Sequence, residues 1–307
     1  MIVIACPGQG SQTPGFLEPW AAESRFREHL EALSDGAELD LLAYGTTADA
    51  ETIRDTRIAQ PLIVAAGLLT LAVLLADGRR SRVGGVAGHS VGEITAAAAS
   101  GILTEDDAIR FVRERGRAMA DAAAIAPSGM CAVVGGDEAE LLVTLATLGL
   151  EPANFNGGGQ IVVAGELEAL DRLKDLAPRG ARVIPLQVAG AFHTRFMAPA
   201  VAHLTEVATS LSPQDPTIPI WTNRDGGTVD SGSDFVRLLV GQVSSPVRWD
   251  RCMESFLAAG VTGIIEVAPA GALTGLAKRG LKGVPSVAIK TPDDLPAAIE
   301  LLAGATA

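Results

Sequence analysis

The stretch Gly88-His89-Ser90-Val91-Gly92-Glu93 decides how this sequence is interpreted, because a strand pattern precedes it and a helix pattern follows it. Residues 83–87 form a short apolar run, and the helical pattern of residues 91–100 ends at Gly101, where helices commonly terminate. In this context a Gly-x-Ser-x-Gly motif predicts a nucleophilic serine on a tight turn, with helix N–H groups directed at a bound carbonyl. The alternative is a glycine-rich turn whose serine is incidental.

Outward from that stretch, strand and helix patterns alternate along most of the chain. Strands are predicted at residues 2–6, 83–87, 218–222, 263–267 and 286–290. Helices are predicted at residues 60–76, 91–100, 104–124, 234–243 and 249–259, and a final helix is predicted to begin at Thr291-Pro292. This alternation is typical of an α/β protein with a mostly parallel sheet.

Residues 129–188 follow a different rhythm. They predict a strand, a helix, a hairpin of two strands, a second helix and a last strand at residues 182–188. That is the order of a ferredoxin-like α+β unit. We therefore expect a ferredoxin-like subdomain at residues 129–188, inserted into a discontinuous large α/β domain formed by residues 1–128 and 189–307.

Composition narrows the classes of function. The chain has 307 residues, 48 % of them hydrophobic, and a formal net charge of −12, which disfavours a nucleic-acid partner. We expect no membrane span, because no unbroken run of 18 apolar residues occurs, and no secretory signal, because the start lacks basic residues. The widely spaced Cys6, Cys131 and Cys252 predict neither disulfides nor a metal site. These features predict a cytoplasmic protein in which an anionic substrate would need a local basic patch. We also expect a monomer, although none of these features determines the oligomeric state.

A serine nucleophile needs a general base, and the chain has four histidines. His29 lies in a polar helical stretch, His203 in a helix among Ala and Leu, and His89 beside the nucleophile on a tight turn. His193 ends an apolar run where the chain returns from the insertion, and strand-end loops are where α/β proteins place catalytic residues. We favour His193, although spacing alone does not bring it to Ser90. An α/β-hydrolase would place its histidine later, which counts against that fold but not against hydrolysis.

Arg115 lies on the apolar face of the helix predicted at residues 104–124. Its neighbours three and four residues away are Phe111, Val112, Ala118 and Met119. The corresponding neighbours of Arg110 and Arg117 are mostly charged, which indicates solvated faces. A buried guanidinium is costly unless it is paired. Arg115 therefore extends its head group to solvent, pairs with an internal carboxylate, or binds a substrate carboxylate through its planar fork. If Arg115 binds a substrate carboxylate, the acyl group that Ser90 accepts must itself carry a free carboxylate.

The loop Gly8-Gln9-Gly10-Ser11-Gln12 follows the first predicted strand. It does not match a dinucleotide fingerprint, because Thr13 stands where the third glycine would be, and it lacks the Lys-Ser/Thr of a Walker A loop. Its backbone N–H groups could supply half of an oxyanion hole.

Several segments together resemble the malonyl-CoA:acyl-carrier-protein transacylase family, which includes the acyltransferase domains of fatty-acid and polyketide synthases. The matching segments run in family order over nearly the whole chain: Gly8–Gln12, 88–93, Arg115-Gly116, Gly190-Ala191-Phe192-His193, Gln242 and Pro246-Val247-Arg248-Trp249. The resemblance implies an α/β-hydrolase-like large domain with a ferredoxin-like insertion. It also implies transfer of malonyl from malonyl-CoA to the phosphopantetheine thiol of a holo acyl carrier protein, with no bound cofactor.

The resemblance also implies roles for individual residues. Ser90 would carry the malonyl ester, and His193 would be general base and acid, oriented by the backbone carbonyl of Gln242. The backbone N–H groups of Gln9 and Val91 would form the oxyanion hole.

Four further residues are implied to bind the substrate. Arg115 would hold the malonyl carboxylate, and Asn156 and Met119 would lie near the acyl or pantetheine path. Phe192 before His193 resembles malonyl-selective members, because a bulky ring leaves little room for an α-methyl branch. One methyl group separates substrates by roughly 1–3 kcal/mol, so this predicts a preference only.

Three other interpretations stay open. The protein could be a serine hydrolase or thioesterase acting on acyl-CoA, a transacylase for another extender unit, or an inert scaffold. The sequence does not distinguish a fatty-acid from a polyketide carrier protein. Lys278, Arg279 and Lys282 form a basic cluster that either contacts coenzyme A phosphates or an acidic carrier, or is plain solvated surface.

Overall fold

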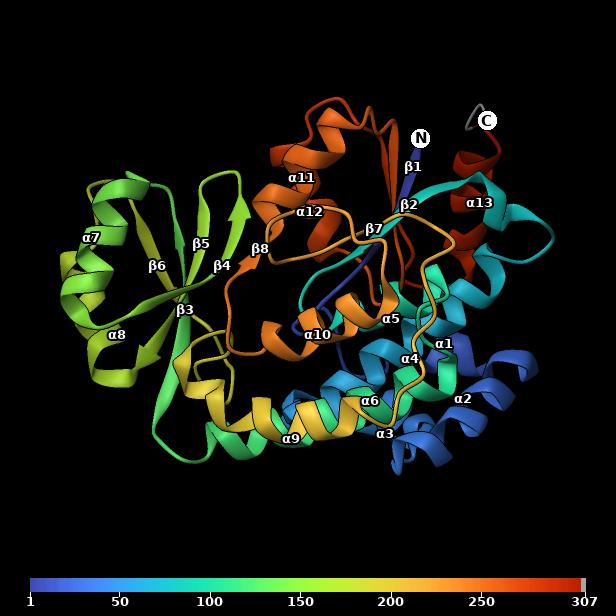
Figure 1. The fold of residues 1–307 in the computed structure, drawn as a ribbon, viewed down its shortest axis with the longest axis horizontal. Coiled ribbons are helices and arrows are strands. Elements are labelled where there is room, and N and C mark those ends of the chain that lie inside the picture. The colour runs from blue at the N-terminus through green and yellow to red at the C-terminus, as the bar shows by residue number, and fades with distance from the viewer. Residues whose placement is uncertain (305–307) are drawn as a thin grey trace.

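Two β-sheets, each of five strands, organise the computed structural model, which describes residues 1–304. Figure 1 shows the first sheet within the larger body of helices and the second sheet at the opposite side of the molecule. The first sheet has the order β10-β9-β1-β2-β7, and all of its pairings are parallel. Its strands are β1 (Ile2–Cys6), β2 (Val83–Gly88), β7 (Ile220–Trp221), β9 (Gly263–Glu266) and β10 (Ser286–Ala288).

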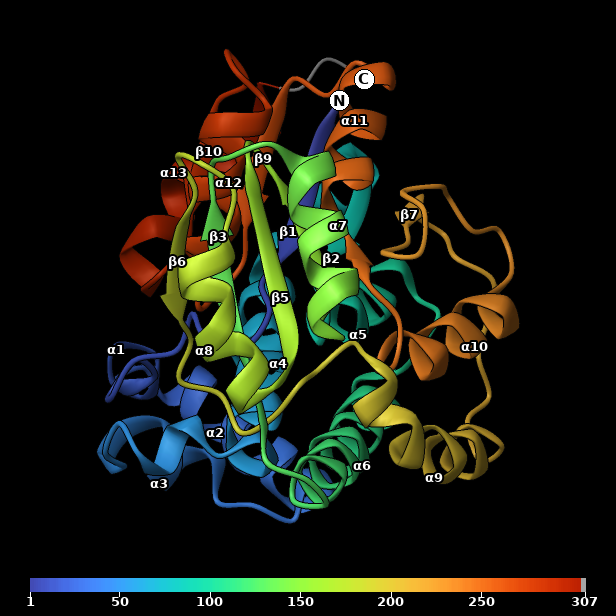
Figure 2. The same cartoon turned by 90° about the vertical axis from the view of Figure 1, so that its left-hand side faces the viewer.

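The second sheet has the order β6-β3-β5-β4-β8. Its strands are β3 (Ser128–Val134), β4 (Glu151–Gly157), β5 (Gln160–Glu166), β6 (Arg182–Pro185) and β8 (Val247–Arg248). The first four pair antiparallel in the ferredoxin-like order, and α7 (Glu138–Leu148) and α8 (Leu167–Leu176) cover the outer face of the sheet (Figure 2). The α/β class with a parallel sheet and a ferredoxin-like insertion is confirmed.

The remaining helices surround the first sheet. They are α1 (Glu18–Ala21), α2 (Ser24–Ala37), α3 (Leu41–Thr47), α4 (Thr56–Leu74), α5 (Gly92–Ser100), α6 (Glu105–Ala123), α9 (Ala198–Ala208), α10 (Gly232–Gln242), α11 (Trp249–Ala258), α12 (Ala272–Gly280) and α13 (Leu295–Ala303). A large buried cluster joins β1, α4, α5 and α6, and a separate cluster lies between the second sheet and its two helices. The two cores leave room for a site between the sheets.

Helix α4 bears on the expectation of no membrane span. By length and composition alone, this helix could cross a membrane. From Pro61 to its end at Leu74, Thr70 is the one polar residue of the helix. In the structure 78 % of this segment is buried, with α5 and α6 packed against it. Burial on all sides explains why the helix has no polar face.

Several predicted boundaries were wrong by a few residues, for local reasons. Helix α4 begins at Thr56 and not at residue 60, because the Asp55 carboxylate caps it by accepting the Arg57 N–H at 2.8 Å. Strand β6 ends at Pro185, which lacks an N–H, and residues 186–188 are not part of the strand, although the Leu186 N–H still donates to the Met130 carbonyl oxygen at 3.0 Å. Thr291 opens a short 3₁₀ turn, Pro292–Asp294, before α13 begins.

The subdomain boundaries at residues 129 and 188 stay a prediction. The segment between them supplies almost all of the second sheet, but β3 already begins at Ser128. Strand β8, beyond the second boundary, adds to the sheet by pairing parallel with β4. The two parts of the chain therefore share a sheet.

Candidate active site

Ser90 sits on the turn between β2 and α5, with its backbone at φ = 54°. This left-handed conformation is uncommon for a non-glycine residue and is held by close backbone packing. A Cβ atom at Gly88 would lie 2.0 Å from the Gly92 carbonyl carbon, and one at Gly92 would lie 2.1 Å from the Cys6 carbonyl oxygen. Both glycines are therefore required for the turn, which lifts the Ser90 side chain above the end of the sheet.

His193 contacts Ser90 directly. The Ser90 Oγ and His193 Nε2 atoms are 2.7 Å apart, and His193 Nδ1 lies 2.9 Å from the backbone carbonyl oxygen of Gln242. Since that carbonyl can only accept, Nδ1 donates to it, and Nε2 is left to accept the Ser90 proton. Burial, followed by the positive charge of Arg115, lowers the pKa of His193 to about 3. His193 is therefore neutral at physiological pH, the form that a general base requires.

Arg115 is 1 % exposed and lies beside the serine. Its Nη2 donates to Ser90 Oγ at 3.2 Å and to Gln242 Oε1 at 2.9 Å, and its Nη1 donates to Gln60 Oε1 at 2.7 Å. Burial lowers the pKa of Arg115 to about 10, which still leaves it protonated at neutral pH. Its partners are amide and hydroxyl oxygens, and the described residues give it no carboxylate ion-pair partner. The site thus holds a buried cation whose charge no neighbouring acid offsets directly.

Glu93 is the nearest buried acid, and it is 1 % exposed. Its carboxyl group accepts hydrogen bonds from the backbone N–H of Asn223 and from Nε2 of Gln242. Burial raises the pKa of Glu93 to about 8, against the opposing effects of these donors and of Arg115. Because burial disfavours the charged form of Glu93, this acid offsets less of the charge of Arg115 than an exposed carboxylate would.

Gln9 and Val91 line the cavity that contains Ser90. Neither backbone N–H donates a hydrogen bond within residues 1–304. Val91 immediately precedes α5, so its N–H also lies at the positive end of that helix. Two unpaired backbone donors from two loops are what an oxyanion hole requires.

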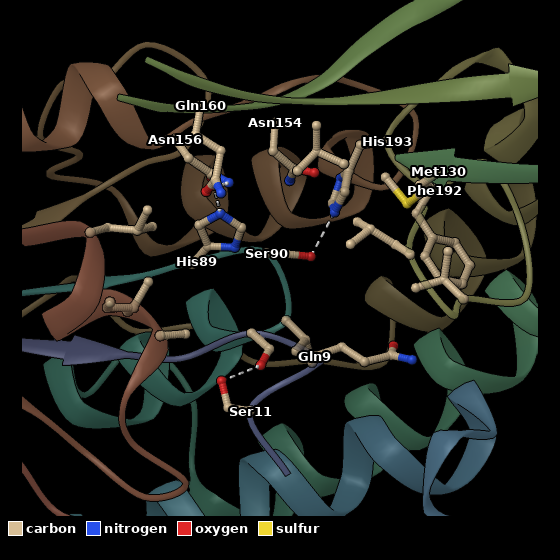
Figure 3. Close-up of a pocket in the computed structure, with 18 of the residues that line it drawn as sticks. Gln9, Ser11, His89, Ser90, Met130, Asn154, Asn156, Gln160, Phe192 and His193 are labelled. Atoms are coloured by element: carbon tan, nitrogen blue, oxygen red, sulfur yellow. Dashed lines mark hydrogen bonds between the residues drawn. The ribbon is translucent and has the colours of Figure 1, made fainter. Parts of the chain in front are cut away.

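A cavity of about 370 Å³ extends from the serine between the two sheets. Figure 3 shows Ser90 and His193 pointing toward each other, with Met130 and Phe192 on one side and a polar cluster on the other. The polar cluster consists of His89, Asn156 and Gln160: Asn156 Oδ1 lies 2.9 Å from His89 Nε2, and its Nδ2 donates to Gln160 at 3.1 Å. The cavity therefore has an apolar end and a polar end.

Most of the other residues predicted to bind the substrate lie around this cavity. Phe192, Met119 and Asn156 line it, and Met119 Sδ accepts a hydrogen bond from Gln60 Nε2 at 3.5 Å, which directs Gln60 Oε1 toward Arg115. Of the basic cluster, Arg279 lines the cavity, whereas Lys278 and Lys282 do not.

The remaining histidines contact other groups. His29 lies 2.7 Å from Glu105, and His203 lies 3.0 Å from Glu114, both near the protein surface. His89 faces Asn156 and packs edge-on against Trp249, away from the serine hydroxyl. His193 is thus the one histidine that reaches Ser90 in the described part of the chain.

Sequence reasoning missed three buried polar residues. Asn223 accepts the Ser90 N–H at 2.8 Å and donates to the Gly88 carbonyl at 2.7 Å, so it holds the turn. Gln60 accepts from Arg115, and Asn154 lines the cavity. Asn223 follows a predicted strand and Gln60 interrupts an apolar helix, the same signals that singled out His193 and Arg115.

The class that this fold and this serine–histidine pair define is acyl transferase, and a family model described as "Acyl transferase domain" matches residues 3–293. The malonyl CoA-acyl carrier protein transacylase of Mycobacterium tuberculosis strain H37Rv is 49 % identical over 299 residues, covering 96 % of this chain and 98 % of that protein. The crystal structure of MCAT from Mycobacterium tuberculosis has a TM-score of 0.94 at 48 % identity, covering 97 % of this chain and 99 % of that one.

A third similar protein is a malonyl-transacylase solved in complex with its type II PKS acyl-carrier protein. It has a TM-score of 0.92 at 31 % identity and covers 98 % of this chain and 99 % of that one. The chain therefore belongs to the malonyl CoA-acyl carrier protein transacylases, within the acyl transferase domain family.

Proposed function

We propose that the chain transfers a malonyl group from malonyl-CoA to the phosphopantetheine thiol of an acyl carrier protein, through a malonyl ester on Ser90. The observation that carries this proposal is the buried, protonated Arg115, whose guanidinium lies 3.2 Å from Ser90 Oγ without a carboxylate ion-pair partner among the described residues. An acyl group with its own carboxylate would offset that charge and form charge-assisted hydrogen bonds with the planar guanidinium. The substrate and carrier named for the family's relatives agree with this chemistry.

The first half-reaction loads the enzyme. His193 Nε2 takes the proton of Ser90 Oγ, and the oxygen attacks the thioester carbonyl carbon of malonyl-CoA. The backbone N–H groups of Gln9 and Val91 hold the resulting oxyanion. When the carbon–sulfur bond breaks, His193 gives the proton to the departing sulfur, so coenzyme A leaves as the thiol and malonyl stays as the Ser90 ester.

The second half-reaction runs the same chemistry in reverse. The carrier thiol gives its proton to His193 and attacks the ester carbonyl carbon. The carbon–oxygen bond breaks, and His193 returns the proton to Ser90 Oγ. Each half-reaction is balanced without an external proton, metal or redox partner.

The malonyl carboxylate also acts on the base. Arg115 is, after burial, the main cause of the lowered pKa of His193. A carboxylate bound to Arg115 offsets that positive charge and raises the pKa of His193, which makes it a stronger base. A carboxylated acyl group is thus favoured in the chemical step as well as in binding.

A loading assay tests the proposal. The protein is incubated with malonyl-CoA, with and without a phosphopantetheinylated carrier protein, and malonyl-carrier and free malonate are measured. We expect rapid malonyl transfer when the carrier is present and slow malonate release when it is absent. Malonate release without carrier at the rate of transfer would identify a hydrolase or thioesterase instead, and faster transfer of another extender unit in competition would identify a different transacylase.

The monomeric state and the cytoplasmic location stay predictions, and fatty-acid and polyketide carriers are both candidates. The transfer assay, run with a fatty-acid carrier protein and with a polyketide carrier protein, shows which of the two carriers the enzyme prefers. The mass of the protein in solution, measured by light scattering, tests the monomer.

A further inference from the structure

Gln242 holds the catalytic residues with two different groups. Its backbone carbonyl oxygen accepts from His193, whereas its side-chain Oε1 accepts from Arg115 Nη2 at 2.9 Å. Since only the oxygen of the amide can accept from a guanidinium, the contact with Arg115 depends on which way the amide faces.

Three acceptors fix that orientation. Gln242 Nε2 donates to the Ser90 carbonyl oxygen at 3.1 Å, to Asn223 Oδ1 at 3.3 Å and, in the shortest of the three contacts, to Glu93 Oε2. If the amide turned over, its oxygen would face these oxygens, and its NH₂ group would face the Arg115 donors. Both contacts would then be unfavourable in a buried site.

Glu93 is the group in this cluster that the mechanism above does not use. It lies in the first turn of α5, is almost fully buried, and takes one N–H on each oxygen, from Asn223 and from Gln242. Keeping an acid in such a place is costly, because burial disfavours its charge. Its contacts lead to Arg115 through Gln242 and to the Ser90 turn through Asn223, and it does not touch the reacting atoms itself.

We propose that Glu93 is a positioning residue that fixes the Gln242 amide, so that the amide oxygen holds the Arg115 guanidinium in position for the carboxylate of the acyl group. Glu93 thereby contributes to the preference for carboxylated acyl groups without touching the substrate. The inference rests on the proposed function, because it assumes that Arg115 binds the acyl carboxylate.

The substitution Glu93→Gln separates positioning from packing. Glutamine has the same shape, but two N–H donors converge on this side chain and an amide has only one oxygen. A glutamine at position 93 must therefore set its own NH₂ group against either the Asn223 N–H or the Gln242 NH₂ group. In the first case the turn loses a contact, and in the second the Gln242 amide is displaced from Arg115.

The experiment compares transfer of malonyl and acetyl groups from their CoA thioesters to the carrier protein. For Glu93→Gln we expect kcat/KM for malonyl-CoA to fall ~10- to 100-fold, the size expected for a disturbed buried hydrogen bond to a charged group, and kcat/KM for acetyl-CoA to fall only about 3-fold or less. Glu266→Gln is the matched control. Glu266 is 0 % exposed and also accepts two backbone N–H groups, from Leu273 and Thr274 at 2.9 and 2.8 Å, but it does not contact the Arg115 cluster. Its variant should leave the malonyl/acetyl ratio unchanged.

A second variant tests the route through Gln242, even if Glu93→Gln fails to fold. Gln242→Met removes the amide and keeps the backbone carbonyl that orients His193, so it should show the same selective loss of malonyl transfer. In the double variant the two losses should not add, because both remove one contact to Arg115. An unchanged malonyl/acetyl ratio in Gln242→Met, an equal fall for both acyl groups in Glu93→Gln, or additive losses would each overturn the inference. A wild-type protein that loads no malonyl group would instead overturn the proposed function.

Discussion

The two sides of the cavity hold their side chains in different ways. On the side of the first sheet, Ser90, His193 and Arg115 each donate hydrogen bonds to buried acceptors of other elements, which hold them in place. On the side of the second sheet, the lining mixes apolar Met130 and Val162 with three amides. Asn156 contacts only His89 and Gln160, and Asn154 makes no side-chain hydrogen bond within the described residues. The first side positions the reacting groups, where small displacements change the rate of the chemical step. The second side binds the acyl thioester by the shape and polarity of the cavity. Substitutions on the first side should therefore change kcat, and those on the second side should change KM.

The largest effect should come from His193, the base on the first side. His193→Ala should lower kcat for malonyl loading by about 10²- to 10⁴-fold, because proton transfer to and from Ser90 is lost. Rapid-mixing measurement of coenzyme A release checks this. A loss smaller than ~10-fold would mean that another group takes the Ser90 proton.

The pH dependence of the wild-type rates also tests the role of His193 as the base. Because the pKa of His193 is lowered to about 3, the acid limb of kcat/KM should lie well below pH 6.5, its ordinary value. Under saturating malonyl-CoA the limb of kcat should move to higher pH, because the bound carboxylate offsets Arg115, whereas with acetyl-CoA it should not move. The lowered pKa also means that this residue contributes stability above pH 6.5 that is lost as the pH falls toward 3. An acid limb at pH 6.5 in kcat/KM would contradict this description of the buried base.

Arg115 should give the next largest effect, and a selective one. Arg115→Ala should lower kcat/KM for malonyl-CoA by ~10- to 150-fold, the equivalent of about 1.5–3 kcal/mol for hydrogen bonds to a charged group, and raise the relative activity on acetyl-CoA. Steady-state transfer with both thioesters measures it. Arg117→Ala on the same helix is the control, because Arg117 is 42 % exposed and pairs with Glu38. Equal losses for malonyl and acetyl would assign Arg115 a structural role.

Phe192 should give a smaller change, in specificity alone. Phe192→Ala opens space at the apolar end of the cavity, so methylmalonyl-CoA should gain up to ~10-fold relative to malonyl-CoA, within the roughly 1–3 kcal/mol that one methyl group contributes. Competition between the two thioesters for one carrier protein measures the ratio. If the ratio stays constant, the ring does not limit the α-position.

The smallest effect should come from the second side. Asn154→Ala should raise KM for malonyl-CoA about 5-fold and leave kcat unchanged, because it removes one neutral hydrogen bond of about 1 kcal/mol that the free amide would make to the bound thioester. Asn154 pairs with β5 and β8 through its backbone, which the substitution leaves in place, so the sheet should keep its stability in thermal unfolding. If kcat fell by a larger factor than KM rose, the claim that residues on the second side act on substrate binding alone would be contradicted.

Much of the fold was predictable, because hydrophobic periodicity and caps are local signals. The Ser90 turn, the α6 start at Thr104 and the ferredoxin-like strand order all follow from neighbouring residues. The short strand β7 was predicted too long, and α12 was not predicted at all, because Gly275 and Gly280 weaken its helical pattern.

The site was predictable only in part. Helical spacing indicated that Arg115 faces the core, but it did not show that its partners are amides and not a carboxylate. The contact of Ser90 with His193 joins residues 103 positions apart, and that with Asn223 joins residues 133 apart. Such pairs depend on how the sheets and loops are assembled, which no local pattern reports.

The central claim is that Ser90 carries the malonyl group between the two half-reactions. It is tested most directly by intact mass and peptide mapping after brief exposure to malonyl-CoA, followed by addition of holo carrier protein. We expect one malonyl group on the peptide that contains Ser90, its complete loss to the carrier on addition, and no labelling of Ser90→Ala. A malonylated carrier formed without any Ser90 ester, or an ester on Ser90 that the carrier does not discharge, would contradict the account.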